Sequence, residues 1–178
     1  MKKSFLTIVA LVTISLTAVA QKQVSTKTHF KFFSTTPAEN IEANNYASVG
    51  TIDTNSGDIV FSVPMQSFEF EKALMQEHFN SKKFLNTKTN PKAKLTGKIS
   101  KANFDKDGTY AADVVGDLTI NGVTNPIKEK ATIVVKGGKI NLTSKFNITL
   151  ADYKVAFKSG KPATNIAKTV EVTVEANY

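Results

Sequence analysis

Apolar and polar residues alternate along most of this chain, and this period of two limits its fold more than any other feature. Successive side chains of a β-strand point to opposite faces, so the alternation predicts strands with one buried face and one face in water. A clear example is the run Ile140, Leu142, Ser144, Phe146, Ile148 and Leu150. Eight segments show the pattern: residues 24–33, 47–53, 58–64, 92–101, 110–120, 127–136, 140–150 and 170–178.

Short turn sequences separate these segments, including Asn121-Gly122 and Gly137-Gly138. Such residues tolerate positive φ and join antiparallel neighbours in hairpins. Residues 68–84 differ, because Leu74, Met75, His78 and Phe79 are spaced as one face of a short helix over residues 71–79. The sequence therefore predicts an all-β fold: an eight-stranded antiparallel lipocalin-like β-barrel with one short helix between strands.

The charge of the chain indicates which face of the sheet lies inside. The formal net charge is +8, and all 23 basic side chains are lysines. An eight-stranded barrel has an interior that is just filled by side chains or by one small ligand, so most of these lysines must lie outside. They form either a solvated face that keeps strand edges from aggregating or a weak contact with an anionic membrane surface.

The first 20 residues have the features of a leader. Lys2 and Lys3 precede an apolar run over residues 5–16, and Ala18-Val19-Ala20 supplies a small-x-small cleavage site. We therefore expect a cleavable signal peptide over residues 1–20, a single barrel domain over residues 21–178, and a periplasmic protein. Nucleic acid is not an expected partner, because export separates the protein from it and no arginine is present to read bases.

The chain has few residues suited to catalysis or metal binding. It has no cysteine, which excludes disulfides, iron–sulfur clusters and a cysteine nucleophile. The two histidines, His29 and His78, are far apart, and no nucleophile, zinc-protease or phosphate-binding motif is present. The sequence predicts no metal site and no enzymatic activity.

Two stretches carry a resemblance to a known family. The run Gly116-Asp117-Leu118-Thr119-Ile120-Asn121-Gly122-Val123-Thr124 is similar to the G-D-L-T-I-x-G-V-T hairpin of the YceI-like family. Residues 61–68 resemble its F-x-V-P-x-x-S-F strand, and residues 75–79 its D/E-H-L/F element, although Leu150 stands where many members have arginine. The resemblance covers residues 30–178. It implies an exported lipocalin-like barrel whose apolar channel holds an isoprenoid tail, with an amphipathic head near the mouth.

Inward-facing apolar residues of the strands are the candidates for lining such a channel. They are Phe30, Phe32, Phe61, Val63, Phe68, Leu118, Ile120, Phe146 and Ile148. They either pack on each other or leave an open bore, in which each buried ligand methylene would contribute about 0.8 kcal/mol.

The helix adds Leu74, Met75, His78 and Phe79 to these candidates. It acts either as a lid or as a permanent plug. His78 is either a core histidine or a group that hydrogen-bonds a ligand oxygen, such as a quinone carbonyl.

The sequence thus predicts an exported protein that binds a long apolar lipid, of the isoprenoid or fatty-acid type, inside the barrel. No cofactor is expected other than such a bound isoprenoid or quinone-like lipid. The alternative is a filled barrel that acts as a structural or stress-related interaction protein without a small ligand.

Overall fold

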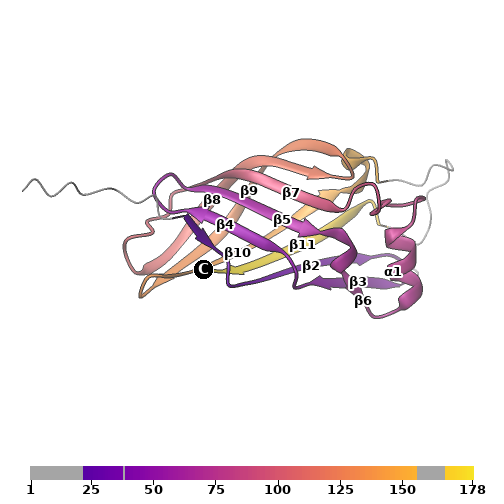
Figure 1. Ribbon diagram of the computed structural model, residues 1–178, viewed down its shortest axis with the longest axis horizontal. Coiled ribbons are helices and arrows are strands. Elements are labelled where there is room, and N and C mark those ends of the chain that lie inside the picture. Colours follow the sequence, from indigo (N-terminus) through magenta and orange to yellow (C-terminus); the bar gives the residue numbers. More distant parts are fainter. Residues whose placement is uncertain (1–21, 38, 156–166) are drawn as a thin grey trace, which may run out of the picture.

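The computed structural model describes residues 22–37, 39–155 and 167–178, so the expected leader lies outside the described residues. One antiparallel sheet of eleven strands curls into an elongated barrel (Figure 1). Its spatial order is β1-β4-β5-β7-β8-β9-β10-β11-β2-β3-β6. The strands are β1 Lys22–Val24, β2 Lys27–Thr35, β3 Asn40–Asn45, β4 Val49–Asp53, β5 Asp58–Pro64, β6 Glu69–Phe70, β7 Lys92–Ser100, β8 Gly108–Ile120, β9 Val123–Lys136, β10 Lys139–Thr149 and β11 Thr169–Asn177.

The barrel closes where β1 runs on into β2. The Ser25 N–H donates to the carbonyl of Gly50, whereas the next N–H, that of Thr26, donates to the carbonyl of Asn177. The chain therefore changes partner strand between these two residues: β1 pairs with β4, and β2 pairs with β11. Because β1 and β2 follow each other in the chain, this change connects the edge strand β1 to β2, which lies near the opposite edge of the sheet, and so closes the barrel.

A fully buried asparagine makes a second connection across the same seam. The side chain of Asn45, at the end of β3, donates to the carbonyl of Pro64 at 2.8 Å and accepts bonds from the Ala47 N–H and the Ser48 hydroxyl. Because buried polar groups need partners, these three bonds fix the turn between β3 and β4 against the end of β5.

The predicted antiparallel barrel is confirmed, but the strand count is eleven rather than eight. The expected strand over residues 24–33 is divided by the partner change into β1 and β2. Two further strands, β3 and β6, were not expected. β3 is rich in asparagine and lacks a clear alternation, and β6 has only two residues.

The expected helix is present as α1, Ala73–Asn80, between β6 and β7. Two short 3₁₀ turns flank the same end of the barrel: η1, Met65–Ser67, after β5, and η2, Leu150–Tyr153, after β10. Figure 1 shows α1 beside β3 and β6, at the end opposite to β1. No helix among residues 22–37, 39–155 and 167–178 is long and apolar enough to span a membrane.

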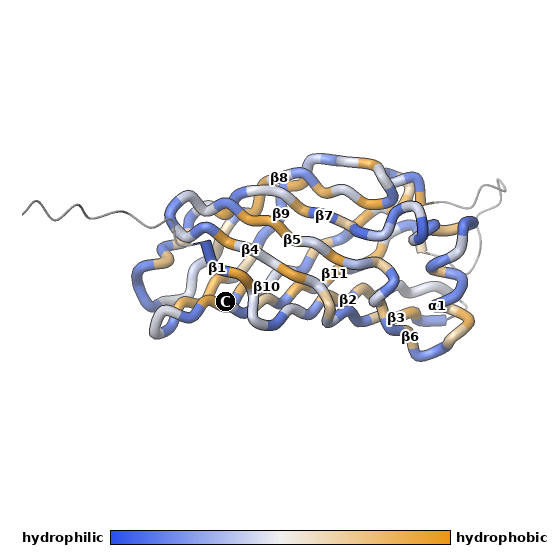
Figure 2. Tube along the Cα trace, viewed as in Figure 1, coloured by the Kyte–Doolittle hydropathy of each residue, from blue (hydrophilic) through white to orange (hydrophobic). Residues whose placement is uncertain are grey.

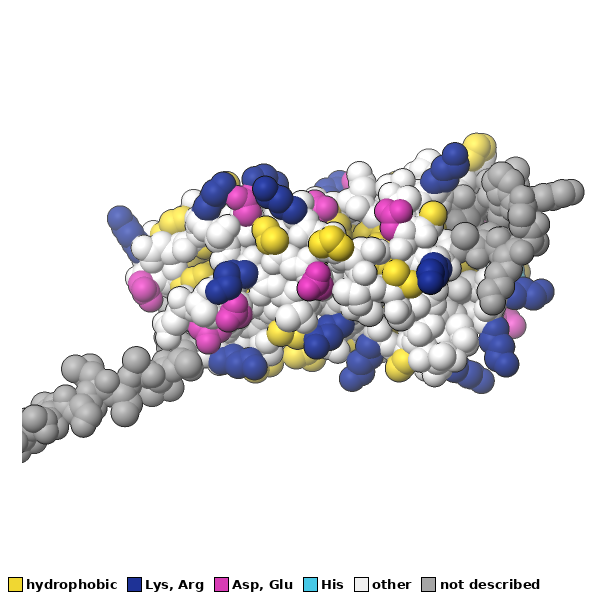
Figure 3. All heavy atoms as spheres, turned by 90° about the horizontal axis from the view of Figure 1, so that it is seen from above, with side chains coloured by type: hydrophobic (Ala, Val, Ile, Leu, Met, Phe, Trp, Pro, Cys, Tyr) yellow, Lys and Arg dark blue, Asp and Glu magenta, His cyan; other side chains and the backbone are white. Residues whose placement is uncertain are grey.

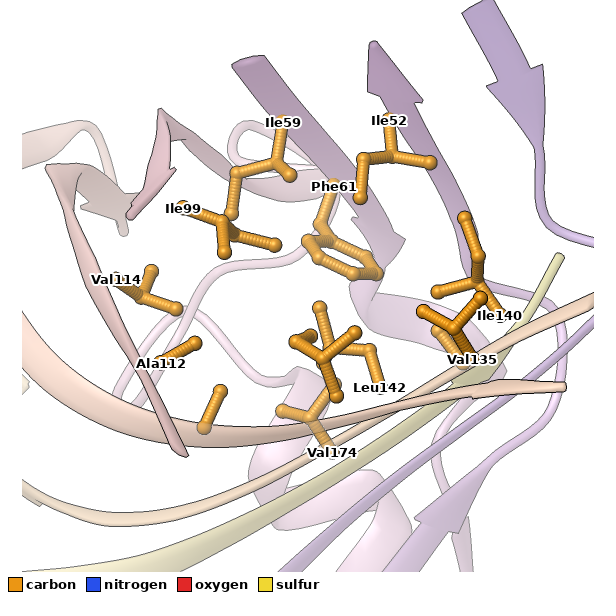
Figure 4. Close-up of a cluster of buried hydrophobic side chains, with 13 residues drawn as sticks. Ile52, Ile59, Phe61, Ile99, Ala112, Val114, Val135, Ile140, Leu142 and Val174 are labelled. Atoms are coloured by element: carbon orange, nitrogen blue, oxygen red, sulfur yellow. The ribbon is translucent and has the colours of Figure 1, made fainter. Parts of the chain in front are cut away.

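Side chains fill the half of the barrel remote from α1. Figure 4 shows apolar residues of both walls meeting there, with Ile52, Ile59 and Phe61 facing Ile140, Leu142 and Val174. Hydropathy alternates along the strands, as the period of two requires (Figure 2). Lysines project from the outer face among scattered acidic residues (Figure 3). One end of the molecule is therefore a conventional packed core.

Candidate ligand-binding site

The other half of the barrel, beneath α1, contains a cavity of about 730 Å³. Protein interiors are close-packed and rarely contain voids larger than a few waters, so a space of this size is not a packing defect. It falls within the range of about 300–1,000 Å³ that is typical of ligand pockets. Its wall is almost entirely apolar, with side chains from β2, β5, β6, α1, β7, β8, β10, η2 and β11.

One wall of the cavity follows a continuous row of paired residues across five strands, and four of the five residues border the cavity. Each member is the direct partner of the next, and every second residue along a strand shares its face, so the whole row faces the interior. The row runs Phe146, Val172, Phe32, Ala43 and Phe70. Small residues alternate with phenylalanines here, and the rings of Phe32 and Phe70 meet edge-on at 5.6 Å across Ala43.

The opposite wall comes from β5, β7 and β8. Val63 is paired with Ala93, and both are buried; Leu118 on β8 continues the same face. Phe61, two residues before Val63, lies deeper, where it packs in the filled half of the barrel and meets Phe30 edge-on at 5.6 Å. Phe61 borders a separate small cavity of about 50 Å³ rather than the main one.

Five phenylalanines gather where α1 meets the barrel. Phe79, the buried residue of α1, stacks on Phe32 with ring centroids 5.6 Å apart and also contacts Phe68, Phe70 and Phe84 at 5.0–6.2 Å. Aromatic pairs at such distances contribute about 0.5–1.5 kcal/mol beyond the area they bury. Phe79 is thus the anchor that holds α1 over the cavity.

The other faces of α1 are open to water. Leu74 is 61% exposed although it borders the cavity, and Met75 is half-buried. His78 is also exposed, so the interpretation of this residue as a core histidine is wrong. It lies on the turn of α1 that borders the cavity mouth, where only part of the helix surface contacts the barrel.

Charged groups collect at this mouth. Lys31, Lys72, Lys83 and Glu39 all border the cavity. Lys72 pairs with Glu39 at 2.8 Å, and this bond raises the pKa of Lys72. Lys83 makes no ion pair within the described part of the chain, so the mouth has a net positive charge.

One polar group faces the cavity without a partner. Ser34 is only 4% exposed, borders the cavity from β2, and its hydroxyl has no hydrogen bond to any described residue. An unsatisfied buried hydroxyl is costly, about 1–3 kcal/mol. Ser34 is therefore available to a ligand oxygen.

The cavity brings together all but one of the residues that the sequence indicated. Twelve border it, whereas Phe61 borders only the smaller space. The twelve are Phe30, Phe32, Val63, Phe68, Leu74, Met75, His78, Phe79, Leu118, Ile120, Phe146 and Ile148. Their role as ligand contacts stays a prediction.

Sequence reasoning missed other parts of the lining. Phe70 belongs to the unexpected strand β6, and Phe84 and Leu85 come from the connection after α1. Tyr153 and Val155 follow β10, where η2 folds back toward β9 through a bond from the Asn125 side chain to the carbonyl of Asp152. The aromatic side chains of Phe70 and Phe84 were the one feature of the sequence that could have indicated these residues as part of the lining.

The two histidines lie in different places: His78 borders the cavity and His29 does not. His29 stacks on Tyr46 and bonds to the side chain of Asn44 at 2.8 Å on the outer face. Among the residues that the structure describes, no three histidines, aspartates or glutamates are close enough together to hold a metal ion.

Solved structures share this architecture. BcnA from Burkholderia cenocepacia superposes with a TM-score of 0.71 at 17% identity, covering 85% of this chain and 96% of that protein. A polyisoprenoid binding domain from Saccharophagus degradans, implicated in plant cell wall breakdown, gives a TM-score of 0.71 at 16% identity, with coverage of 85% and 92%. At such identities the similarity concerns the fold.

Sequence comparison gives partial matches to curated proteins at higher identity. A UPF0312 protein of Pseudomonas aeruginosa is 37% identical over 87 residues, which are 49% of this chain and 37% of that protein. A UPF0312 protein of Pectobacterium atrosepticum is 28% identical over 128 residues, 68% of this chain and 58% of that protein. The matched part of this chain thus spans less than two thirds of either relative. A family model described as a YceI-like domain matches residues 13–178, and the chain therefore belongs to the YceI-like family.

Proposed function

We propose that this protein binds a single long apolar lipid, of the isoprenoid or fatty-acid type, in the cavity beneath α1, and that it catalyses no reaction. The observation that carries the proposal is the 730 Å³ apolar cavity in a domain whose other half is filled by side chains apart from a space of about 50 Å³. Water in so apolar a space would find few hydrogen-bonding partners, whereas each buried methylene contributes about 0.8 kcal/mol. The polyisoprenoid binding domain with the same fold supports the same ligand class.

The distribution of polar groups gives the ligand a direction. Lys72, Lys83 and Glu39 border the cavity at the α1 end, whereas its inner end is made by apolar residues such as Val63 and Phe146. We infer that the hydrocarbon chain points inward and that an oxygen-bearing head lies at the mouth, within reach of Ser34 or a lysine. α1 acts as a lid, held mainly by Phe79.

The leader pattern supports export to the periplasm as part of this proposal. The mouth supports a transient contact with anionic membranes, because the exposed Leu74 lies beside Lys72 and Lys83. An apolar side chain flanked by cations is suited to the surface of an anionic bilayer. The proposed role is to take a lipid from one membrane surface and carry it through water.

The ligand can be identified directly. Protein purified without detergent is extracted with organic solvent, and the extract is analysed by mass spectrometry. We expect one lipid species in near-stoichiometric amount.

The matched variants are Val172→Trp, which fills the cavity from β11, and Thr173→Trp, which places the same side chain on the outer face of the same strand. The milder Val170→Phe also narrows the cavity. Lipid should be lost from Val172→Trp and reduced in Val170→Phe but retained by Thr173→Trp. Equal lipid content in all of them, or none in the wild type from several hosts, would refute the proposal.

A further inference from the structure

Ser34 interrupts an otherwise aliphatic row of the cavity wall. Two residues nearer the α1 end than the row through Phe32, the inward-facing residues of the same strands are Ile148, Val170, Ser34 and Ile41. Ile148 is paired with Val170, Ser34 is paired with Ile41, and all four border the cavity. Ser34 is the one member of this row whose side chain can form a hydrogen bond.

The hydroxyl of Ser34 is buried and has no partner among the described residues. Ser81, which also borders the cavity, differs because its hydroxyl donates to the carbonyl of His78 at 2.7 Å. A buried hydroxyl without a partner destabilises the empty protein. Because a serine side chain turns about a single bond, this hydroxyl can turn toward a ligand that lies against the wall.

The charges on this side of the mouth are already paired. Glu39 lies two residues before the strand partner of Ser34, and its carboxylate binds Lys72 at 2.8 Å. Lys31, a second cation that borders the cavity, binds Glu42 at 3.5 Å. A carboxylate or phosphate head beside Ser34 would lose its water close to the Glu39 carboxylate and would find no free cation there.

We propose that Ser34 binds the head of the lipid and that this head is uncharged, with a carbonyl or hydroxyl oxygen that accepts a hydrogen bond from the Ser34 hydroxyl. This rests on the proposed function and narrows its oxygen-bearing head to a neutral one. The ligand supplies the partner that the folded chain lacks, so Ser34 is a specificity-determining residue. An anionic head is suited instead to Lys83, which follows α1, and the test separates the two.

The test measures Kd of the delipidated protein for a straight-chain alkane, a methyl ketone and a carboxylate with the same number of carbons, by displacement of a fluorescent polyene hydrocarbon. Ser34→Ala should raise Kd for the ketone about fivefold to tenfold, because it removes one net hydrogen bond. Kd for the alkane should be nearly unchanged, since an alkane cannot bond to Ser34. Kd for the carboxylate should also change little, because its head does not lie at this position.

Two further variants control for the substitution itself. Ser34→Thr keeps the hydroxyl and should retain most of the affinity for the ketone. Thr35→Ala removes a hydroxyl from the next residue of β2, which is exposed on the outer face, and should change none of the three Kd values. Delipidated Ser34→Ala should have an unchanged or higher Tm, because the empty protein loses an unsatisfied buried group.

The outcomes distinguish this inference from the proposed function. An equal change in Kd for ketone and alkane, or a lower Tm of Ser34→Ala with an unchanged Kd for the ketone, would overturn the role of Ser34. The largest change for the carboxylate would overturn the neutral head. In each of these cases the proposed function stands if Val172→Trp, which fills the cavity, abolishes binding. No binding of any of the three ligands by the wild type would refute the proposed function as well.

Discussion

Gly97 of β7 and Gly116 of β8 are direct partners in the sheet, and neither position has room for a side chain. A Cβ on Gly97 would lie 2.5 Å from the carbonyl oxygen of Val115, and a Cβ on Gly116 would be equally crowded by the carbonyl oxygen of Thr96. Gly116→Ala should therefore lower the free energy of unfolding by about 1–3 kcal/mol, measured by denaturant titration. Asp117→Ala, on the adjacent exposed position, should change it by less than about 0.5 kcal/mol. Equal losses of unfolding free energy in Gly116→Ala and Asp117→Ala would contradict the view that Gly116 has no room for a Cβ.

Phe79 is expected to govern both the stability and the lipid content of the protein. Phe79→Ala removes a buried ring that contacts four other phenylalanines, which should cost about 3–5 kcal/mol of unfolding free energy. Phe79→Leu should cost less and retain more lipid during purification. Thermal unfolding and extraction of the purified proteins measure the two effects. A Phe79→Ala protein with wild-type lipid content would show that α1 does not retain the ligand.

Asp113 links stability to pH through two lysines. Lys101 lies 2.6 Å from one carboxylate oxygen and Lys130 bonds to the other, and these hydrogen bonds lower the pKa of Asp113 to about 2. Because the pKa is lower in the folded state than in the unfolded chain, the stabilisation is present at neutral pH and is lost as the pH falls from about 4 to about 2. Asp113→Asn should thus lower Tm at neutral pH and have little effect near pH 2.

The control for this titration is Asp117→Asn, whose carboxyl group makes no ion pair with any residue that the structure describes. It should leave Tm nearly unchanged at every pH. A Tm difference for Asp113→Asn that persists undiminished to pH 2 would show that its origin is not the ionised carboxylate.

Tyr178 offers a substitution that should stabilise the protein. Its hydroxyl is buried without a partner among the described residues, and this burial raises its pKa well above the usual range. Tyr178→Phe removes the unsatisfied group and keeps the ring, so the free energy of unfolding should rise by up to about 1 kcal/mol in denaturant titrations. A loss of more than that amount would mean that the hydroxyl has a stabilising contact.

Leu74 should speed the transfer of lipid from membranes without contributing to stability. It is 61% exposed at the cavity mouth, so Leu74→Ser should leave Tm unchanged but slow the uptake of a fluorescent fatty acid from vesicles containing anionic phospholipid. Ala73→Ser, at the exposed neighbouring position, is the control. High salt should slow transfer by the wild type, because it screens the attraction of the lysines to the vesicle. Equal rates of fatty-acid uptake by Leu74→Ser and Ala73→Ser would show that Leu74 takes no part in the contact with the vesicle.

The alternation of residues predicted the barrel well but left two strands unseen. In β3, only Ala43 and Asn45 are buried, and Asn45 is a polar residue that the hydrophobic pattern assigns to the surface. Its burial depends on bonds to Pro64, Ala47 and Ser48 that exist only in the folded chain. β6 is too short to show any period.

The same limit explains why the sequence left the interior undecided between filled and hollow. Phe61 and Val63 are alternate residues of one strand, yet one packs in the filled half and the other borders the cavity. Their local pattern is identical, and the difference arises from which side chains face them from the opposite wall. Ile59 and Phe61 meet Leu142 and Val174, whereas α1 and the small Ala93 leave a space beside Val63.

The partner change between Ser25 and Thr26 has a practical consequence for handling the protein. Because β1 and Tyr178 both lie at the filled end, Lys22 and Tyr178 are remote from α1 (Figure 1). A purification tag or a surface tether joined beyond either residue would leave the mouth of the cavity unobstructed. Immobilised molecules would then expose the cavity mouth to the solution, so that binding of the proposed lipid could be measured on a surface.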